Sequence, residues 1–278
     1  MYNKNVDSSE TDGEDCLSQS MGKSKMKNEI TQQFLESIQN KNTQASYCIA
    51  LKEFTAWYEQ TTAESPNWQT LKKAELEKYI SYLQTEKRYR PTSIYAHISA
   101  IRSLLRSLGH TPPVLKLPRQ ERRAIKALSE NELNQMLACV EDSPRDYAIL
   151  CLMAKAGMRV GEVIGLEISD LEINEKSGWA LIRSGKGNKT RRVPLNSEVR
   201  QALKTWLDVR PSSTQSPNVF ISRTGKPLST RDIQRKIADL VRVANLEGNI
   251  TPHTLRHTFA TRFIEKNGSL ASLQIILG

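Results

Sequence analysis

The hydrophobic positions between residues 28 and 109 recur at intervals of three and four residues, which is the period of an amphipathic helix. Four such stripes are present: Phe34, Leu35 and Ile38; Tyr47, Leu51, Phe54, Trp57 and Tyr58; Leu71, Leu76, Tyr79, Ile80 and Leu83; and Ile94, Ile98, Ile101, Leu104, Leu105 and Leu108. Pro66 and Pro91 separate neighbouring stripes. Four short helices that each bury one stripe predict a small helical bundle over residues 28–109.

The segment 110–127 interrupts this pattern with three prolines and a cluster of basic side chains. The basic residues are Lys116, Arg119, Arg122, Arg123 and Lys126, and they are accompanied by one acid, Glu121. A proline-stiffened basic segment makes a poor core element and suits a linker that lies across a phosphate backbone. We therefore expect a domain boundary here, with a second domain over residues 128–278.

The second domain begins with a mixed pattern. Ser129 and Glu132 form a capping-box sequence before a hydrophobic stripe, which predicts a helix start. Residues 147–154 predict a buried helix that ends at Gly157, and a short helix is expected within 158–166. Short β-patterned pieces follow at 167–168, 179–182 and 191–195, and the sequence 185–189 predicts a hairpin turn before the last of them.

The rest of the chain returns to mostly helical signals. We expect a helix over 197–209, a short strand over 218–222 and a basic helix capped by Ser229. Thr251 before Pro252 predicts the start of another helix, and Asn267–Gly268 its end. The predicted fold class is mainly α with a small β-sheet, as a four-helix N-terminal domain followed by an α+β domain.

Composition and charge point to a polyanionic partner. The net charge is +10 and the isoelectric point is near 9.4, while 38% of the residues are apolar, enough for a core. Since no apolar run approaches the roughly 20 residues of a bilayer span, nucleic acid is the expected partner rather than a membrane.

The N-terminal tail and the cysteines add little chemistry. Residues 1–27 are acidic and polar and predict a disordered tail. The four cysteines are scattered without a Cys-x-x-Cys pair, and no secretory leader precedes them. We therefore expect a reduced cytoplasmic protein.

The candidate chemistry begins on the helix after Thr251, where His253, Arg256 and His257 share one face at positions i, i+3 and i+4. A guanidinium beside an imidazole can hold a phosphate and move a proton near it. An amphipathic helix with exposed His and Arg would look the same. A zinc site at His253 and His257 is the weaker interpretation, because no Glu lies between them and no third ligand is obvious.

A resemblance to a known family favours the phosphate interpretation. His-Thr-Leu-Arg-His-Thr-Phe-Ala-Thr (253–261) resembles the second signature box of the tyrosine recombinases, the phage integrase and Xer family. Ala-Gly-Met-Arg-Val-Gly-Glu-Val-Ile-Gly-Leu (156–166) resembles the first box, and Gly-Lys-Gly (185–187) resembles the hairpin that carries a catalytic lysine. The absence of an additional N-terminal arm-binding domain favours an Xer-like or transposon resolvase-like member.

The resemblance implies a role for each matching residue. Arg159 and Arg256 would clamp the scissile phosphate, and Lys186, with Lys189 as the fallback, would be the general acid. His253 would bind the phosphate or transfer a proton. The supporting residues would be Glu162 and His257.

The resemblance also implies how the protein meets DNA. Residues 28–109 would be a SAM-like core-binding domain that grips double-stranded DNA. The candidate DNA-binding residues are Lys87, Arg88, Arg90, Lys116, Arg119, Arg122, Arg123, Lys126, Arg231 and Arg235. Family members need no cofactor or metal, and they assemble as dimers or tetramers on DNA or with a partner recombinase.

The position of the nucleophile is the one departure from the family pattern. In the family, a third His or Trp follows Leu-Leu-Gly at once and the nucleophilic tyrosine comes shortly afterwards, whereas this sequence ends at Leu277–Gly278. The eight tyrosines all lie upstream: Tyr2, Tyr47, Tyr58, Tyr79, Tyr82, Tyr89, Tyr95 and Tyr147. We therefore expect a parent protein that recombines DNA through a 3′-phosphotyrosine, and a chain ending at Gly278 that binds DNA without cleaving it.

Two other function classes remain open at this point. One is a catalytically inert DNA-binding protein or regulator. The other is a metal hydrolase that uses His253 and His257, which would leave Arg159, Arg256 and Lys186 unexplained. DNA cleavage without a metal ion would distinguish a tyrosine recombinase from both the inert DNA-binding protein and the metal hydrolase.

Overall fold

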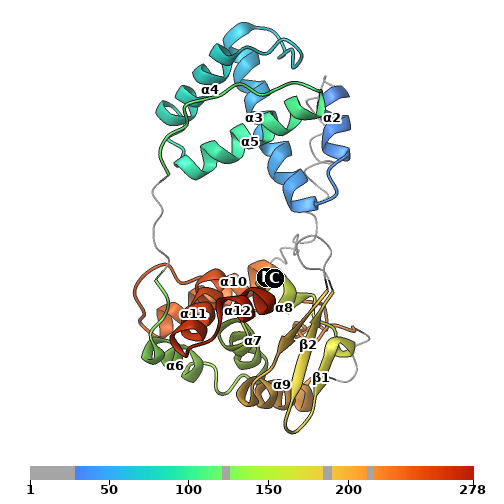
Figure 1. The fold of residues 1–278 in the computed structure, drawn as a ribbon, viewed down its shortest axis with the longest axis vertical. Helices are drawn as coiled ribbons and strands as arrows, with labels where there is room; N and C mark the ends of the chain where they lie inside the picture. Colours follow the sequence, from blue (N-terminus) through green and yellow to red (C-terminus); the bar gives the residue numbers. More distant parts are fainter. Residues whose placement is uncertain (1–28, 121–125, 184–189, 212–215) are drawn as a thin grey trace, which may run out of the picture. The chain divides into compact units, whose positions relative to one another are not determined.

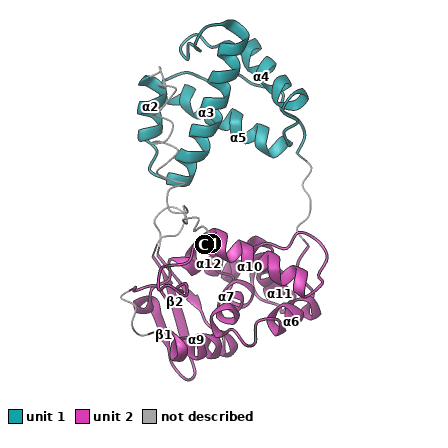
Figure 2. Ribbon diagram, turned by 180° about the vertical axis from the view of Figure 1, so that it is seen from behind, with its two compact units in different colours: residues 1–122 teal, residues 123–278 magenta. Residues whose placement is uncertain are grey.

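The computed structural model describes residues 29–120, 126–183, 190–211 and 216–278 (Figure 1). The chain divides into two compact units, Met1–Arg122 and Arg123–Gly278, which Figure 2 shows in separate colours. Each unit buries its own hydrophobic cluster. The division falls within the basic segment 110–127.

In the described part of unit 1, all regular secondary structure is helical. The unit contains α2 (Glu29–Glu36), α3 (Lys41–Thr62), α4 (Lys73–Thr85) and α5 (Pro91–Ser107). The four predicted helices are therefore confirmed. Helices α3 and α5 pack against each other, and the Phe54 ring of α3 meets the Tyr79 ring of α4 edge to face at 4.9 Å. Trp57 and Trp68 complete this aromatic core.

Unit 2 combines helices with a small antiparallel sheet. Its helices are α6 (Glu130–Ala138), α7 (Pro144–Lys155), α8 (Val160–Ile164), α9 (Ser197–Val209), α10 (Thr230–Val243), α11 (Pro252–Glu265) and α12 (Leu270–Leu277). The strands β1 (Leu171–Ile173), β2 (Gly178–Ile182) and β3 (Arg191–Pro194) pair in the order β1-β2-β3. The predicted fold class, mainly α with a small sheet, is confirmed.

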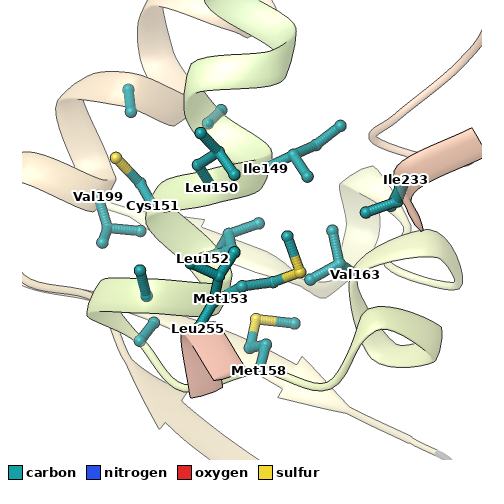
Figure 3. Close-up of a cluster of buried hydrophobic side chains, with 14 of the residues drawn as sticks. Ile149, Leu150, Cys151, Leu152, Met153, Met158, Val163, Val199, Ile233 and Leu255 are labelled. Carbon is teal, nitrogen blue, oxygen red and sulfur yellow. The ribbon is translucent and has the colours of Figure 1, made fainter. Parts of the chain in front are cut away.

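Helix α7 is the centre of unit 2. It packs against α8, α9 and α11, and its residues from Ala148 to Ala154 are all buried. Figure 3 shows Leu152 and Met153 of α7 beside Val163 of α8 and Leu255 of α11. An almost continuous apolar run is what a helix needs when neighbours cover it on several sides.

The local helix signals are confirmed. As predicted, Ser129 caps α6 in a capping box, Ser229 caps α10 and Thr251 caps α11 with Pro252 as the first helical residue. The predicted helix over 197–209 is α9, and Asn196, which sequence reasoning did not single out, caps it. Each cap satisfies a backbone N–H that the helix itself leaves without a partner. These ends therefore follow from a few adjacent residues.

Two predicted strands are wrong. Residues 168–170 form a 3₁₀ turn in which the Asp170 carboxylate accepts a hydrogen bond from the Glu167 backbone N–H at 3.1 Å, and β1 begins only at Leu171. Residues 218–222 form isolated bridges, to Glu167 and Pro227, instead of a strand. Val219 and Phe220 are apolar because they are buried in the core of unit 2, and burial alone explains the pattern.

None of the described helices is long and apolar enough to cross a membrane. Within the described residues, Cys48, Cys139 and Cys151 form no disulfide bond. The predicted N-terminal tail and Cys16 lie outside the described residues.

Candidate active site

Arg159 caps the short helix α8 and is held there by Glu162. The Arg159 backbone N–H donates to Glu162 Oε2 at 2.8 Å, and its Nη1 donates to Glu162 Oε1 at 2.8 Å. Nη2 donates to the Gly278 carbonyl at 2.9 Å. The Arg159 side chain is 39% exposed, so solvent reaches it.

Arg256 approaches the same carboxylate from α11. Its Nη1 donates to the Gly157 carbonyl at 2.7 Å and lies 3.8 Å from Glu162 Oε2. Its Nη2 donates to the Leu277 carbonyl at 2.8 Å. The side chain is only 10% exposed, so its orientation is fixed by these partners.

A glycine and a threonine near Arg256 fix the position of its helix. Gly157 has φ +70°, and a Cβ there would come within 2.3 Å of the Phe259 ring, so only glycine suits this position. On the other face of α11, the Thr258 hydroxyl accepts a hydrogen bond from the Leu128 N–H at 2.9 Å and donates to the Thr254 carbonyl. These contacts tie α11 to the segment before α6 and to the loop after α7.

A third guanidinium, from Arg191 on β3, completes the cluster. Its Nη1 and Nη2 donate to the two oxygens of Glu162 at 2.9 and 2.8 Å, and its Nε donates to the Ile276 carbonyl at 2.8 Å. Sequence reasoning missed Arg191, because a basic residue at the start of a strand next to a turn carries no distinguishing signal.

The charges in this arginine cluster, defined as Arg159, Arg191, Arg256 and Glu162, are coupled. Burial raises the pKa of the Glu162 carboxyl, but hydrogen bonds from Arg191 and Arg159 outweigh it, and the pKa lies below its usual range. Burial, and then the charge of Arg159, lower the pKa of Arg256 to about 10. The Glu162 carboxylate and the Arg256 guanidinium are therefore both ionised at neutral pH. Arginine side chains stay charged in proteins, so the three cations and one anion of the cluster leave a net charge of +2 that can hold a phosphate.

The two histidines lie on α11 near Arg256. His253 is exposed and lies one turn before it, and His257 is half-buried. Lys186 and Lys189 lie outside the described residues. Within the described part of the chain, no group of three or more His, Cys, Asp or Glu side chains gathers in a metal-binding arrangement.

The candidate DNA-binding residues of unit 1 occupy one loop and the segment after α5. Lys87 is paired with Glu53 at 3.3 Å, and the Tyr89 hydroxyl donates to both oxygens of that carboxylate. Arg88, with φ +52°, and Arg90 are exposed on either side of Tyr89. Lys116 and Arg119 are also exposed.

The candidate DNA-binding residues of unit 2 lie in two places. Lys126 is exposed, with its Nζ 3.7 Å from Glu132. Arg231 and Arg235 are exposed in the first turns of α10, and Arg235 is paired with Asp232 at 2.6 Å. Arg122 and Arg123 lie outside the described residues. The ion pairs of Lys126 and Arg235 are made with Glu132 and Asp232, and neither involves the arginine cluster.

Comparison with known proteins identifies both units. The phage integrase family model matches residues 126–278, and the phage integrase N-terminal SAM-like domain matches residues 29–112. The tyrosine recombinase XerC of Vibrio vulnificus (strain YJ016) is 34% identical over 201 residues, which cover 68% of this chain and just under two thirds, 63%, of that protein. The XerC of Yersinia pestis is 32% identical over 223 residues, which cover 76% and 72%.

Solved structures share the fold. The XerA recombinase is 30% identical with a TM-score of 0.52, and the alignment covers 90% of this chain and 89% of that one. The XerH recombinase, solved bound to a palindromic difH substrate, has a TM-score of 0.70 at 21% identity, with coverages of 86% and 72%. The family matches over both units, together with the identity to XerC proteins, show that this chain belongs to the phage integrase family of tyrosine recombinases.

Proposed function

We propose that the protein recombines DNA at specific sites, by cutting a strand, holding the broken end as a 3′-phosphotyrosine and joining it to another strand. The observation that carries this proposal is the convergence of Arg159 and Arg256 on Glu162, from α8 and α11. Two guanidiniums that share one carboxylate partner lie close enough together to hold the non-bridging oxygens of a single phosphate from two sides.

The chemistry needs positioning and charge more than a cofactor. A tyrosine oxygen attacks phosphorus, the bond from phosphorus to the 5′ oxygen breaks, and the phosphate gains negative charge in the transition state. Arg159 and Arg256 stabilise that charge. Lys186 gives its proton to the departing 5′ oxygen, and His253 binds the phosphate or transfers a proton. Because the phosphotyrosine conserves the bond energy, no ATP is used.

The nucleophile is assigned to no tyrosine of this chain. Tyr147 is the one tyrosine in unit 2, and its hydroxyl donates to Glu198 at 3.3 Å, between α7 and α9. The other candidates of the described chain belong to the helices or loops of unit 1. The cleavage assays below therefore use the protein expressed from its complete reading frame.

DNA is the proposed partner, and two or four copies, or a partner recombinase, are proposed to assemble on it. XerH was solved bound to difH substrate, the Tn1549 transposon integrase with circular intermediate DNA, and λ integrase as a dimer on a core site. Strand exchange joins two duplexes, so it needs active sites on both.

A duplex suicide substrate tests the proposal. In EDTA, the complete protein should form a covalent protein–DNA adduct that survives denaturing electrophoresis. Cleavage that needs a divalent metal and leaves no adduct would favour the metal hydrolase. Binding to the same duplex without any adduct would favour the inert DNA-binding protein.

DNA affinity should fall steeply with salt, because phosphate contacts release counterions. Replacing Arg122 and Arg123 by Ala should reduce the slope of log Kd against log salt by about one unit for each phosphate that is no longer neutralised, on any sequence. Fluorescence anisotropy with specific and random duplexes measures this slope. Lys176→Ala with Lys204→Ala removes the same charge from residues outside the proposed interface and should leave the slope unchanged. An unchanged slope in the Arg122/Arg123 variant would remove these residues from the interface.

Lys186→Ala should abolish cleavage of an ordinary substrate but not of one whose 5′ leaving group is sulfur, since a thiolate leaves without a proton. Arg159→Ala and Arg256→Ala should stay slow on both substrates. The ratio of adduct-formation rates on the two substrates measures the effect. Equal rescue of all three variants would transfer the general-acid role to Lys189 or His253.

A further inference from the structure

The first residue of β3 makes contacts that the chemistry above does not use. Arg191 binds both carboxylate oxygens of Glu162 and the carbonyl of Ile276 through three separate nitrogens, and its side chain is 10% exposed. A parallel two-bond pair between guanidinium and carboxylate fixes both planes, which a single charge contact does not.

Glu162 is the point where the three guanidiniums meet. Oε1 accepts from Arg159 and Arg191, and Oε2 accepts from Arg191 and from the Arg159 backbone, with Arg256 at 3.8 Å. The orientation of this carboxylate therefore sets the position of Arg159, and Arg191 is the partner that binds it through both oxygens from a separate element.

We propose that Arg191 is a positioning residue for DNA cleavage: it fixes the Glu162 carboxylate, which aims Arg159 and Arg256 at the scissile phosphate. Arg191 itself does not bind the phosphate. This inference rests on the proposed function, because it concerns the same site.

Arg191 differs from Arg159 in its exposure to solvent and in its hydrogen-bond partners. Arg191 uses Nε, Nη1 and Nη2 on protein acceptors and is 10% exposed, whereas Arg159 is 39% exposed. Arg256 is as buried as Arg191, but its two hydrogen bonds go to backbone carbonyls and its Nη1 lies 3.8 Å from Glu162 Oε2, so it forms no two-bond pair with the carboxylate. A phosphate can approach the more exposed Arg159 side chain while Glu162 keeps its bond to Arg191. To bind Arg191 directly, a phosphate would have to break a buried two-bond ion pair, which is strongly unfavourable.

Arg191 also contacts elements other than α8. It pairs with Ile182 across β2 and β3, and the segment that carries Lys186 lies between these two residues in the sequence. Its bond to Ile276 reaches the last turn of α12. The backbone of Arg191 thus lies at the base of the proposed lysine hairpin, and its guanidinium contacts both α8 and α12.

The test compares Arg191→Met, Arg191→Lys and the control Arg192→Ala in the complete protein. Arg192 is the exposed neighbour on the same strand, so its replacement removes the same charge without touching Glu162. Single-turnover adduct formation at saturating protein gives the cleavage rate, anisotropy gives the DNA affinity, and ¹³C NMR of labelled Glu carboxyls, assigned with Glu162→Gln, gives the Glu162 titration.

Arg191→Met should slow cleavage by about 10- to 100-fold, the scale expected when catalytic groups shift by a fraction of their contact distance. DNA affinity should stay near wild type, and Arg191→Lys, which keeps the charge but not the fork, should be intermediate. The groups that face Glu162 are Arg159, Arg191 and Arg256, so removing Arg191 lets burial raise the Glu162 pKa. The acid limb of the rate profile and the NMR titration should then both move to higher pH, while Arg192→Ala matches wild type.

A double variant decides between positioning and direct contact. If Arg191 acts through Glu162, Arg191→Met should slow the Glu162→Gln protein far less than it slows wild type. Equal slowing in both backgrounds would mean that Arg191 touches the phosphate, and would overturn the inference. So would an unmoved Glu162 titration in both Arg191 variants, the Lys variant serving if the Met variant does not fold. If wild-type protein forms no adduct, the proposed function fails, and the NMR titration still decides whether Arg191 controls Glu162.

Discussion

Arg159→Ala and Arg256→Ala should each slow cleavage by a factor of about 10² or more, the scale seen when one preorganised charge-stabilising donor is removed. The complete protein, a suicide duplex and single-turnover conditions measure this rate. DNA affinity should change little, because most of it comes from phosphates away from the cut. Arg159→Lys and Arg256→Lys should also be slow, since an ammonium cannot form the two parallel bonds of a guanidinium.

The two arginines should differ in their effect on folding. Arg256 is buried and donates to the carbonyls of Gly157 and Leu277, so its removal leaves two acceptors without partners. Arg159 is more exposed, and its removal should lower the melting temperature less. Arg242→Ala, which breaks only an exposed pair with Asp239, serves as the matched control for both measurements. Cleavage at wild-type rate in either Ala variant would remove that arginine from the proposed clamp.

The sequence predicted those parts of the fold that depend on neighbours along the chain. The helix starts at Ser129 and Thr251 rest on side chains that bond the backbone three residues later, so short patterns contain the whole signal. The pairing of Arg159 with Glu162 is equally local, because one turn of helix brings them together.

Contacts between distant segments could not be predicted in this way. Arg191 and Glu162 are joined only because the sheet packs beside α8, and no spacing in the sequence encodes that contact. Lys87 is predicted as a phosphate contact, and its pairing with Glu53 from the preceding part of the bundle is a contact that no local pattern predicts. The apolar run at 218–222 predicts a strand, but burial in the core does not require a ladder of hydrogen bonds.

Glu162→Gln should destabilise unit 2 by roughly 3–5 kcal/mol at neutral pH, the range found when one partner of a buried ion pair is removed. Glutamine keeps the shape of the side chain, but its NH₂ would face a guanidinium, and Arg191 and Arg256 would lose the one carboxylate in their cluster. Urea denaturation of the two proteins measures the difference. Glu77→Gln, which affects only an exposed pair with Lys73, is the control and should change stability by about 1 kcal/mol or less.

The pH dependence of this difference tests its cause. The folded pKa of Glu162 lies below its unfolded value, so its ionic contribution is fully present above the unfolded pKa and is lost as the pH falls through the folded pKa. The stability gap between wild type and Glu162→Gln should therefore be constant near neutral pH and shrink in acid, below the normal range of a glutamate. A gap that does not change with pH would show that glutamine disturbs packing rather than charge, and that the carboxylate is not what holds the three guanidiniums together.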